Sequence, residues 1–227
     1  MKRIDPARKI SGKVSLPGDK SISHRAALLG ALSSEGVTVH NFSDGTDCAS
    51  TLSCLEQAGA RVRRSGTTLS VSAPNGLRSP EGMLDAGNSG TTARTLCGLL
   101  AGRPGVKARL AGDASLSKRP MLRVVKPLRS MGAQIDGPSD GSLLPLEISG
   151  TRLKGATHLL ETPSAQVKTA LLLAGLGSEE PTTVIEPLAT RNHTERMLAH
   201  LGVPLYFDGH SITIAPSKPL KGGEWTI

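Results

Sequence analysis

A threefold internal repeat constrains this 227-residue chain more than any other feature. The segments LEQAGARV from Leu55, LRSMGAQI from Leu128 and LAHLGVPL from Leu198 each read as a helix end, a glycine and an extended run. Their spacings of 73 and 70 residues indicate repeated supersecondary units. A glycine at this point is typical of the left-handed residue that ends a helix. The chain is therefore expected to fold from three copies of one unit.

Another helix and several strands complete each unit. The apolar runs HRAALLGALS, TARTLCGLLAG and QVKTALLLAGL predict the first helices. The β-like runs VTVHNF, VKARLAG and TTVIEP follow them, and the alternating runs TTLSVSA, LPLEIS and SITIAP end the units. Each unit reads βαβαββ, so the predicted fold class is α/β (α+β), a pseudo-threefold domain of three βαβαββ repeats.

The second helix of each unit is expected to be amphipathic and to cover the core with one face. In the third unit, Met197, Leu198 and Leu201 are predicted to face the core, because they recur at helical spacing. By the same pattern, Glu195 and His200 are predicted to face water.

The three loops that lead into the first helices share a composition rich in Gly, Ser and Thr. They read LPGDKSISHR, DAGNSGTTAR and LETPSAQVK. In a threefold domain they are expected to converge, and free N–H groups and positive dipole ends would then favour an anion. Plain N-capping explains any one loop, but its recurrence favours an anion site. The second loop is neither GxxxxGK[ST] nor GxGxxG, so neither nucleotide fingerprint applies.

The charge and composition of the chain limit the kinds of ligand that it could bind. The formal net charge is +8, with only four aromatic residues to stack on bases, namely Phe42, Tyr206, Phe207 and Trp225. A binder of single-stranded nucleic acid needs such platforms. A small, strongly anionic ligand and the phosphates of a duplex both remain open at this point.

The sequence also disfavours a membrane-spanning protein, a secreted protein and a protein stabilised by disulfides or a metal. The longest apolar stretch, Ala170–Leu176, is far shorter than the ~20 residues of a membrane span. The first residues lack the apolar core of a secretory signal. Cys48, Cys54 and Cys97 form no CxxC pair, so a disulfide framework or a metal site is not expected. These observations favour buried thiols in a reducing cytoplasm, with no metal, no cofactor and no membrane partner.

Five motifs carry a resemblance to a known family. LPGDKSISHRA, GNSGTT, SLSKRPM, SAQVKTALLLAGL and RNHTERML, in this order over residues 16–198, resemble the N-terminal half of 5-enolpyruvylshikimate-3-phosphate (EPSP) synthases. The resemblance implies an enolpyruvyl transferase-like inside-out α/β barrel. It further implies that residues 1–16 are the first strand of an otherwise missing C-terminal-type domain. Residues 17–225 would be the N-terminal three-repeat substrate-binding domain, and residues 226–227 the start of the crossover to the missing domain.

The resemblance also implies the reaction. These enzymes of chorismate and aromatic amino acid biosynthesis transfer the enolpyruvyl group of phosphoenolpyruvate to the 5-hydroxyl of shikimate 3-phosphate. Addition is followed by elimination, through a tetrahedral intermediate. The acid/base residues lie in the missing half, so the chain alone is predicted to give no turnover, and no nucleic-acid partner is expected.

The motifs assign roles by position. Lys20 would contact both substrates and share proton transfer, and Ser21 with Arg25 would bind the shikimate carboxylate. Gly90 would line the phosphoenolpyruvate pocket and leave room for the inhibitor glyphosate, while Arg119 would hold the phosphate or carboxylate of phosphoenolpyruvate. The remaining shikimate 3-phosphate contacts would come from Ser164, Ala165, Gln166 and Arg191, of which Arg191 takes the place of a serine in many relatives.

Two alternatives remain open from the sequence. An enolpyruvyl transferase acting on UDP-N-acetylglucosamine would carry a catalytic cysteine just before Arg119, where this chain reads AGDASLSKR. A non-catalytic module that binds nucleic acid or another anion is the second alternative. A steep dependence of DNA affinity on salt would favour the nucleic-acid version, since counterion release drives that binding.

Overall fold

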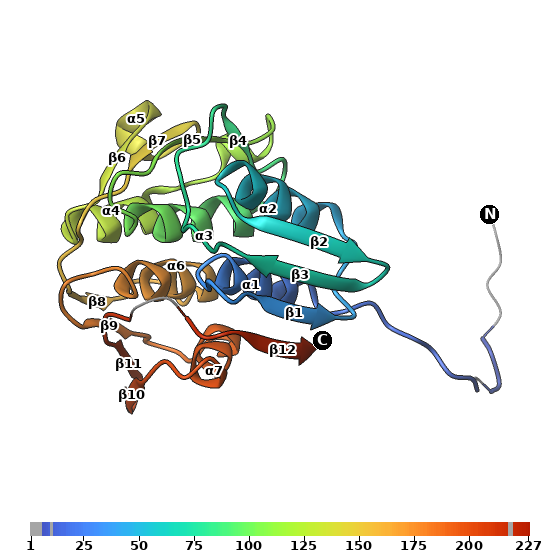
Figure 1. Cartoon of the computed structure of the whole chain (residues 1–227). Helices are drawn as coiled ribbons and strands as arrows, with labels where there is room; N and C mark the ends of the chain where they lie inside the picture. Colours follow the sequence, from blue (N-terminus) through green and yellow to red (C-terminus); the bar gives the residue numbers. More distant parts are fainter. Residues whose placement is uncertain (1–5, 10, 218–219) are drawn as a thin grey trace.

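Three four-stranded sheets surround a layer of buried helices in the computed structural model, which describes residues 6–9, 11–217 and 220–227 (Figure 1). The helices are α1 (Lys20–Gly30), α2 (Thr46–Gln57), α3 (Gly90–Ala101), α4 (Leu122–Ser130), α5 (Pro138–Gly141), α6 (Ala165–Gly175) and α7 (His193–His200). The strands are β1 (Val37–His40), β2 (Arg61–Ser65), β3 (Thr68–Ser72), β4 (Leu84–Asp85), β5 (Lys107–Ala111), β6 (Gln134–Asp136), β7 (Leu146–Ser149), β8 (Thr157–Leu159), β9 (Thr182–Ile185), β10 (Leu205–Asp208), β11 (Ser211–Ile214) and β12 (Gly223–Thr226).

The three sheets have one topology, which confirms the predicted repeat. Their strand orders are β4-β5-β7-β6, β8-β9-β11-β10 and β12-β1-β3-β2. In each sheet the first pair is parallel and the other pairs are antiparallel. In two sheets the parallel pair is joined by a buried helix, namely α3 between β4 and β5 and α6 between β8 and β9.

The first strand of the first unit comes from the other end of the described chain. Strand β12 pairs in parallel with β1, and Val37 lies opposite Gly223. It therefore occupies the place that β4 and β8 occupy in their sheets. The sheet runs through Thr226, one residue beyond the boundary predicted at residue 225. The crossover assigned to residues 226–227 stays a prediction.

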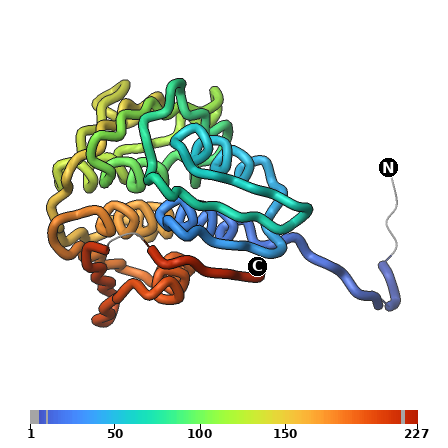
Figure 2. Tube along the Cα trace, viewed as in Figure 1, coloured from blue at the N-terminus to red at the C-terminus, as the bar shows by residue number. Residues whose placement is uncertain are grey.

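The described residues 6–9 and 11–16 extend away from the domain (Figure 2). Of the described residues before α1, none forms a strand, and Val14 and Leu16 are 81% and 73% exposed. Residues 1–5 and 10 of the predicted 1–16 strand lie outside the described residues. Its assignment to a second domain remains a prediction.

The first helices of the units form the centre of the domain. Every residue of α3 except Thr91 is buried, and Gly98 lets α3 approach α6 closely. A Cβ atom at Gly98 would lie 2.0 Å from the carbonyl oxygen of Ala170. Burial of this kind fits the single charged residue in each helix, Arg94 in α3 and Lys168 in α6, each of which has a polar partner inside the protein.

The second helices end as the repeat predicts. Gly59, Gly132 and Gly202 have φ values of +96°, +94° and +78°, in the left-handed region that favours glycine. In α7, Met197 and Leu198 are buried as expected. The prediction for Glu195 was wrong: it is 3% exposed, because it pairs with a buried lysine from α6.

The thiols are also buried. Cys48, Cys54 and Cys97 are free cysteines, and burial raises the pKa of Cys54 and of Cys97 to about 12. Both therefore stay protonated and unreactive at neutral pH. Within the described ranges, no helix is long and apolar enough to cross a membrane.

Candidate functional site

Hydrogen bonds tie the N-terminal ends of α1, α3 and α6 together, as the loops predicted. The Arg25 Nη2 group of α1 donates to the carbonyl oxygen of Ala165 at 3.4 Å. Between α3 and α6, Arg94 Nη1 donates to Gln166 Oε1 at 3.0 Å, and Gln166 Nε2 donates to Thr91 Oγ1 at 3.0 Å. Three helix N-termini, and their partial positive charge, therefore meet at one place.

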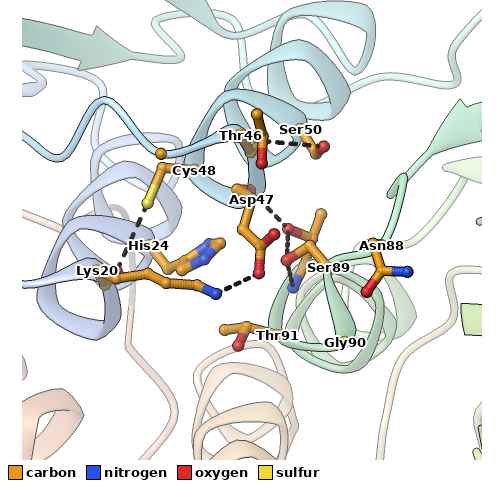
Figure 3. Close-up of polar contacts among 12 residues, drawn as sticks. Lys20, His24, Thr46, Asp47, Cys48, Ser50, Asn88, Ser89, Gly90 and Thr91 are labelled. Carbon is orange, nitrogen blue, oxygen red and sulfur yellow. Dashed lines mark hydrogen bonds and ion pairs between the residues drawn. The ribbon is translucent and has the colours of Figure 1, made fainter. Parts of the chain in front are cut away.

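The first loop places Lys20 at the mouth of α1. Asp19 caps the helix by accepting the Ile22 N–H at 2.8 Å, so Lys20 is the first helical residue. The Lys20 ammonium is half exposed and forms an ion pair with Asp47 at the start of α2 (Figure 3). Asp47 was missed by the sequence reasoning, because α2 begins with no recognised anion-binding loop. The pair holds the ammonium between the N-terminal ends of α1 and α2.

Arg25 is held inside the protein. It is 3% exposed, and its guanidinium donates to the hydroxyls of Thr194 and Thr169 at 2.7 and 2.8 Å. Further bonds go to the carbonyl oxygens of Ser21 and Ala165. Burial lowers the pKa of Arg25, although nearby Glu195 opposes this effect. Four bonds leave one of the five guanidinium N–H groups for a ligand.

The second loop brings backbone close to the same place. Asp85 accepts the Gly87 N–H at 2.8 Å, and Gly87 has a φ of +56°. Ser89 caps α3 by accepting the N–H of Thr92 at 3.1 Å. Gly90 is the first residue of α3, and a Cβ atom there would lie 2.6 Å from Arg94 Nη1. Because Gly90 has no side chain, the Arg94 guanidinium can occupy the space beside it.

Two arginines flank this loop. Arg119 Nη2 donates to Asn88 Oδ1 at 2.6 Å, while Asn88 Nδ2 donates to Asp113 at 2.7 Å. Arg94, which the sequence reasoning did not assign, is 4% exposed and donates to Gln166 and to the Pro120 carbonyl. Burial, followed by the nearby charges of Arg123 and Arg119, lowers the pKa of Arg94 to about 10. Arg94 thus remains charged at neutral pH.

The third loop contributes polar groups from α6 and α7. Ser164 caps α6 by accepting the N–H of Val167 at 3.4 Å, and Gln166 bridges to α3. Arg191 is exposed, yet its Nη1 group donates to Ser21 Oγ at 3.1 Å. The structure therefore brings Arg191 to the mouth of α1, 170 residues away in sequence.

A buried chain of hydroxyls supports the first two loops from behind. The His24 Nδ1 atom lies 2.7 Å from Thr51 Oγ1, which lies 2.6 Å from Thr92 Oγ1. Thr92 in turn donates to Ser89 Oγ at 2.7 Å. Desolvation lowers the pKa of His24 to about 4, so the imidazole is neutral at pH 7. It holds α1, α2 and α3 in register without adding charge to the site.

Comparisons with known proteins fit this geometry. The family model described as EPSP synthase (3-phosphoshikimate 1-carboxyvinyltransferase) matches residues 4–227. The chain belongs to the EPSP synthase family. Among its relatives, the 3-phosphoshikimate 1-carboxyvinyltransferase of Bacillus subtilis (strain 168) is 46% identical over 226 residues, covering 99% of this chain and 52% of the relative. That of Anaeromyxobacter sp. (strain Fw109-5) is 50% identical over 215 residues, covering 95% of this chain and 50% of the relative.

Solved structures agree with the fold of the EPSP synthase family. An EPSP synthase structure from Acinetobacter baumannii has a TM-score of 0.90 and 40% sequence identity. The match covers 95% of this chain and 50% of that one. The chain thus spans about half the length of the relatives it matches. The likeness confirms the mixed α/β fold predicted from the repeat.

The EPSP synthase motifs therefore fall together in space. Seven of the nine predicted site residues lie on the three joined loops or in the first two turns of their helices: Lys20, Ser21, Arg25, Gly90, Ser164, Ala165 and Gln166. Arg119 and Arg191 come from other segments and reach these loops through Asn88 and Ser21. Their individual contacts with substrate stay predictions. The structure adds Asp47 and Arg94 to the set. A signal for Arg94 existed in the sequence, since it lies one helical turn after Gly90.

Proposed function

We propose that this chain forms the substrate-binding half of an EPSP synthase, which moves the enolpyruvyl group of phosphoenolpyruvate to the 5-hydroxyl of shikimate 3-phosphate. One observation carries the proposal, namely the convergence of three helix N-termini with the cations Lys20, Arg25, Arg94, Arg119 and Arg191. Both substrates combine a carboxylate with a phosphate. Charge-assisted bonds from arginine forks and backbone N–H groups recognise such groups.

The shikimate 3-phosphate side of the site is proposed to run from α1 to α6. Ser21 and the remaining N–H of Arg25 bind the carboxylate, and Arg191 stands beside Ser21. The loop Ser164–Ala165–Gln166 contacts the phosphate and ring oxygens, because its capping hydroxyl and amide lie at the α6 N-terminus.

The phosphoenolpyruvate side is proposed to lie at the N-terminus of α3. Gly90 supplies a close backbone approach, and Arg119 presents its guanidinium beside Asn88. Lys20 lies between the two sides. A lysine ammonium can release and accept a proton, so Lys20 is placed to share proton transfer while Asp47 orients it.

The rest of the catalytic machinery is assigned to a C-terminal domain as the partner of this one. The chain alone is expected to show no steady turnover of the two substrates. Addition of the C-terminal half of a relative in trans is expected to restore phosphate release, and steady turnover by the isolated chain would contradict this assignment. A cytoplasmic location belongs to the same proposal, because three free thiols suit a reducing compartment.

Calorimetric titration of shikimate 3-phosphate into the chain tests the proposal. Lys20→Ala is expected to weaken binding about tenfold or more, as loss of a charge-assisted bond does. Arg119→Ala is expected to weaken it by less than about threefold, because Arg119 serves the other substrate. Lys107→Ala removes a like charge at an exposed position of strand β5 and serves as the control. Equal losses in all three variants, or no binding by the unaltered chain, would contradict the proposal.

A further inference from the structure

A buried ionic cluster lies directly behind the first and third loops. The ammonium of Lys168 on α6 is 2.6 Å from Glu186 Oε2, at the end of β9, and 2.7 Å from Glu195 Oε1, on α7. All three side chains are at most 5% exposed. The second oxygen of Glu195 is buried and has no hydrogen-bond partner among the described residues. One cation and two carboxylates give this cluster a charge of −1.

Two threonines connect the cluster to Arg25. Thr169 follows Lys168 on α6, and Thr194 precedes Glu195 on α7. Their hydroxyls lie 2.7 Å apart, and the Arg25 guanidinium donates to both. The ion pair between α6 and α7 thus fixes the distance between the two acceptors that hold Arg25.

A second connection leads to Arg191. The other oxygen of Glu186 accepts the hydroxyl of Thr190 at 2.5 Å. Arg191 follows Thr190 in the chain and donates to Ser21 Oγ. Glu186 therefore anchors the start of the segment that carries Arg191 to the mouth of α1.

The charges of this region balance. Arg25 and Lys168 supply two positive charges, and Glu186 and Glu195 supply two negative ones, all in residues at most 4% exposed. Glu195 is near enough to Arg25 to raise the pKa of its guanidinium against the effect of burial. An anion bound to Arg25 would therefore also experience the negative charge of Glu195, in surroundings that screen charge poorly.

We propose that Lys168, Glu186 and Glu195 are positioning residues of the Arg25 anion site: they hold the acceptors of Arg25 in place and set the affinity for an anion through their net charge. The inference rests on the proposed function, in which Arg25 binds the carboxylate of shikimate 3-phosphate. It assigns a role to buried groups that do not touch the substrate.

The sign of the effect separates this role from simple packing. Glu195→Gln keeps the size of the side chain and the Glu186 partner of Lys168, but removes one negative charge near Arg25. Affinity for shikimate 3-phosphate is expected to rise about three- to tenfold, since a single charge at this range changes binding on that order. Lys168→Met leaves two unpaired carboxylates, and affinity is expected to fall about tenfold or more.

The double variant Lys168→Met/Glu195→Gln restores the charge balance and is expected to bind within about threefold of the unaltered chain. Glu179→Gln is the matched control, since Glu179 is exposed and lies past the opposite end of α6, where it pairs with Arg152. It is expected to leave affinity unchanged. Lys168→Met is a candidate for misfolding, and in that case Glu195→Gln and the double variant decide the question.

Calorimetric titration of the 227-residue chain with shikimate 3-phosphate gives all of these values. A rise for Glu195→Gln, with recovery in the double variant, supports the inference. Weaker binding by Glu195→Gln, or a double variant that binds no better than Lys168→Met, overturns it while leaving the proposed function standing. If the unaltered chain and Glu195→Gln both fail to bind, the proposed function and this inference fall together.

Discussion

The buried imidazole of His24 makes a quantitative prediction about stability and pH. The side chain is fully buried in α1, and its Nδ1 atom is bonded to Thr51. Desolvation lowers the pKa from an ordinary 6.5 to about 4; Asp47 opposes the shift, and the charges of Lys20 and Arg25 add to it. The unfolded chain therefore binds a proton at His24 at a higher pH than the folded chain does.

The sign and the size follow from proton linkage. Well above pH 6.5 both states are neutral at His24, so the residue contributes no pH dependence there. As the pH falls toward 4, only the unfolded state gains the proton, and the free energy of unfolding decreases. The loss due to His24 amounts to about 1 kcal/mol at pH 6, about 2 kcal/mol at pH 5 and about 3 kcal/mol at pH 4. Below the folded-state pKa it stops growing.

Urea unfolding of the chain and of His24→Asn at pH 7, 6 and 5 measures this loss. Asparagine keeps a polar atom near Thr51 but does not titrate, so the difference between the two proteins cancels every other ionisable group. The variant is expected to be the less stable protein at pH 7, and this deficit should shrink by about 2 kcal/mol at pH 5. A deficit that stays constant between pH 7 and pH 5 would refute the reasoning, because His24 would then titrate alike in both states.

Two further predictions concern glycines in α3. Gly98→Ala should lower the free energy of unfolding by about 2 kcal/mol or more, since its Cβ would overlap the backbone of Ala170 and force two packed helices apart. Gly82→Ala is the control for urea unfolding, because a Cβ at Gly82 would lie in open space. Equal stability of the two variants would contradict the packing argument. Gly90→Ala should displace the Arg94 guanidinium, 2.6 Å from the added Cβ, so that an enzyme assembled with a C-terminal half becomes less sensitive to glyphosate in a phosphate-release assay. Unchanged inhibition would count against it.

Much of the fold was predictable because its signals are local. The glycines that end α2, α4 and α7, the alternating strands and the capped loops each depend on a few neighbouring residues. Repetition of these signals three times made the topology readable. The same loops indicated an anion site, since helix N-termini attract negative charge wherever they are exposed.

The errors and omissions share a different cause. Glu195 follows the pattern of a solvent-facing position, yet it is buried, because Lys168 from another helix pairs with it. Asp47 carries no distinguishing local signal and gains its role from Lys20. The spacing of Arg94 from Gly90 places it near the second loop, but only the fold shows that it bonds to Gln166 of another helix. Helical periodicity shows on which face of its helix a residue lies. It does not show whether another helix or strand will place an opposite charge against that face.

The sequence by itself determined the three βαβαββ units, their capped loops and an excess of positive charge suited to a small anionic ligand. Tertiary structure alone decided that β12 completes the first sheet, that Arg191 reaches Ser21 and that four buried charges balance behind Arg25. These contacts join residues up to 186 positions apart. The β12–β1 pairing and the contacts of Arg191 and Arg25 exist because the last part of the chain packs against the first unit, a condition that no local pattern encodes.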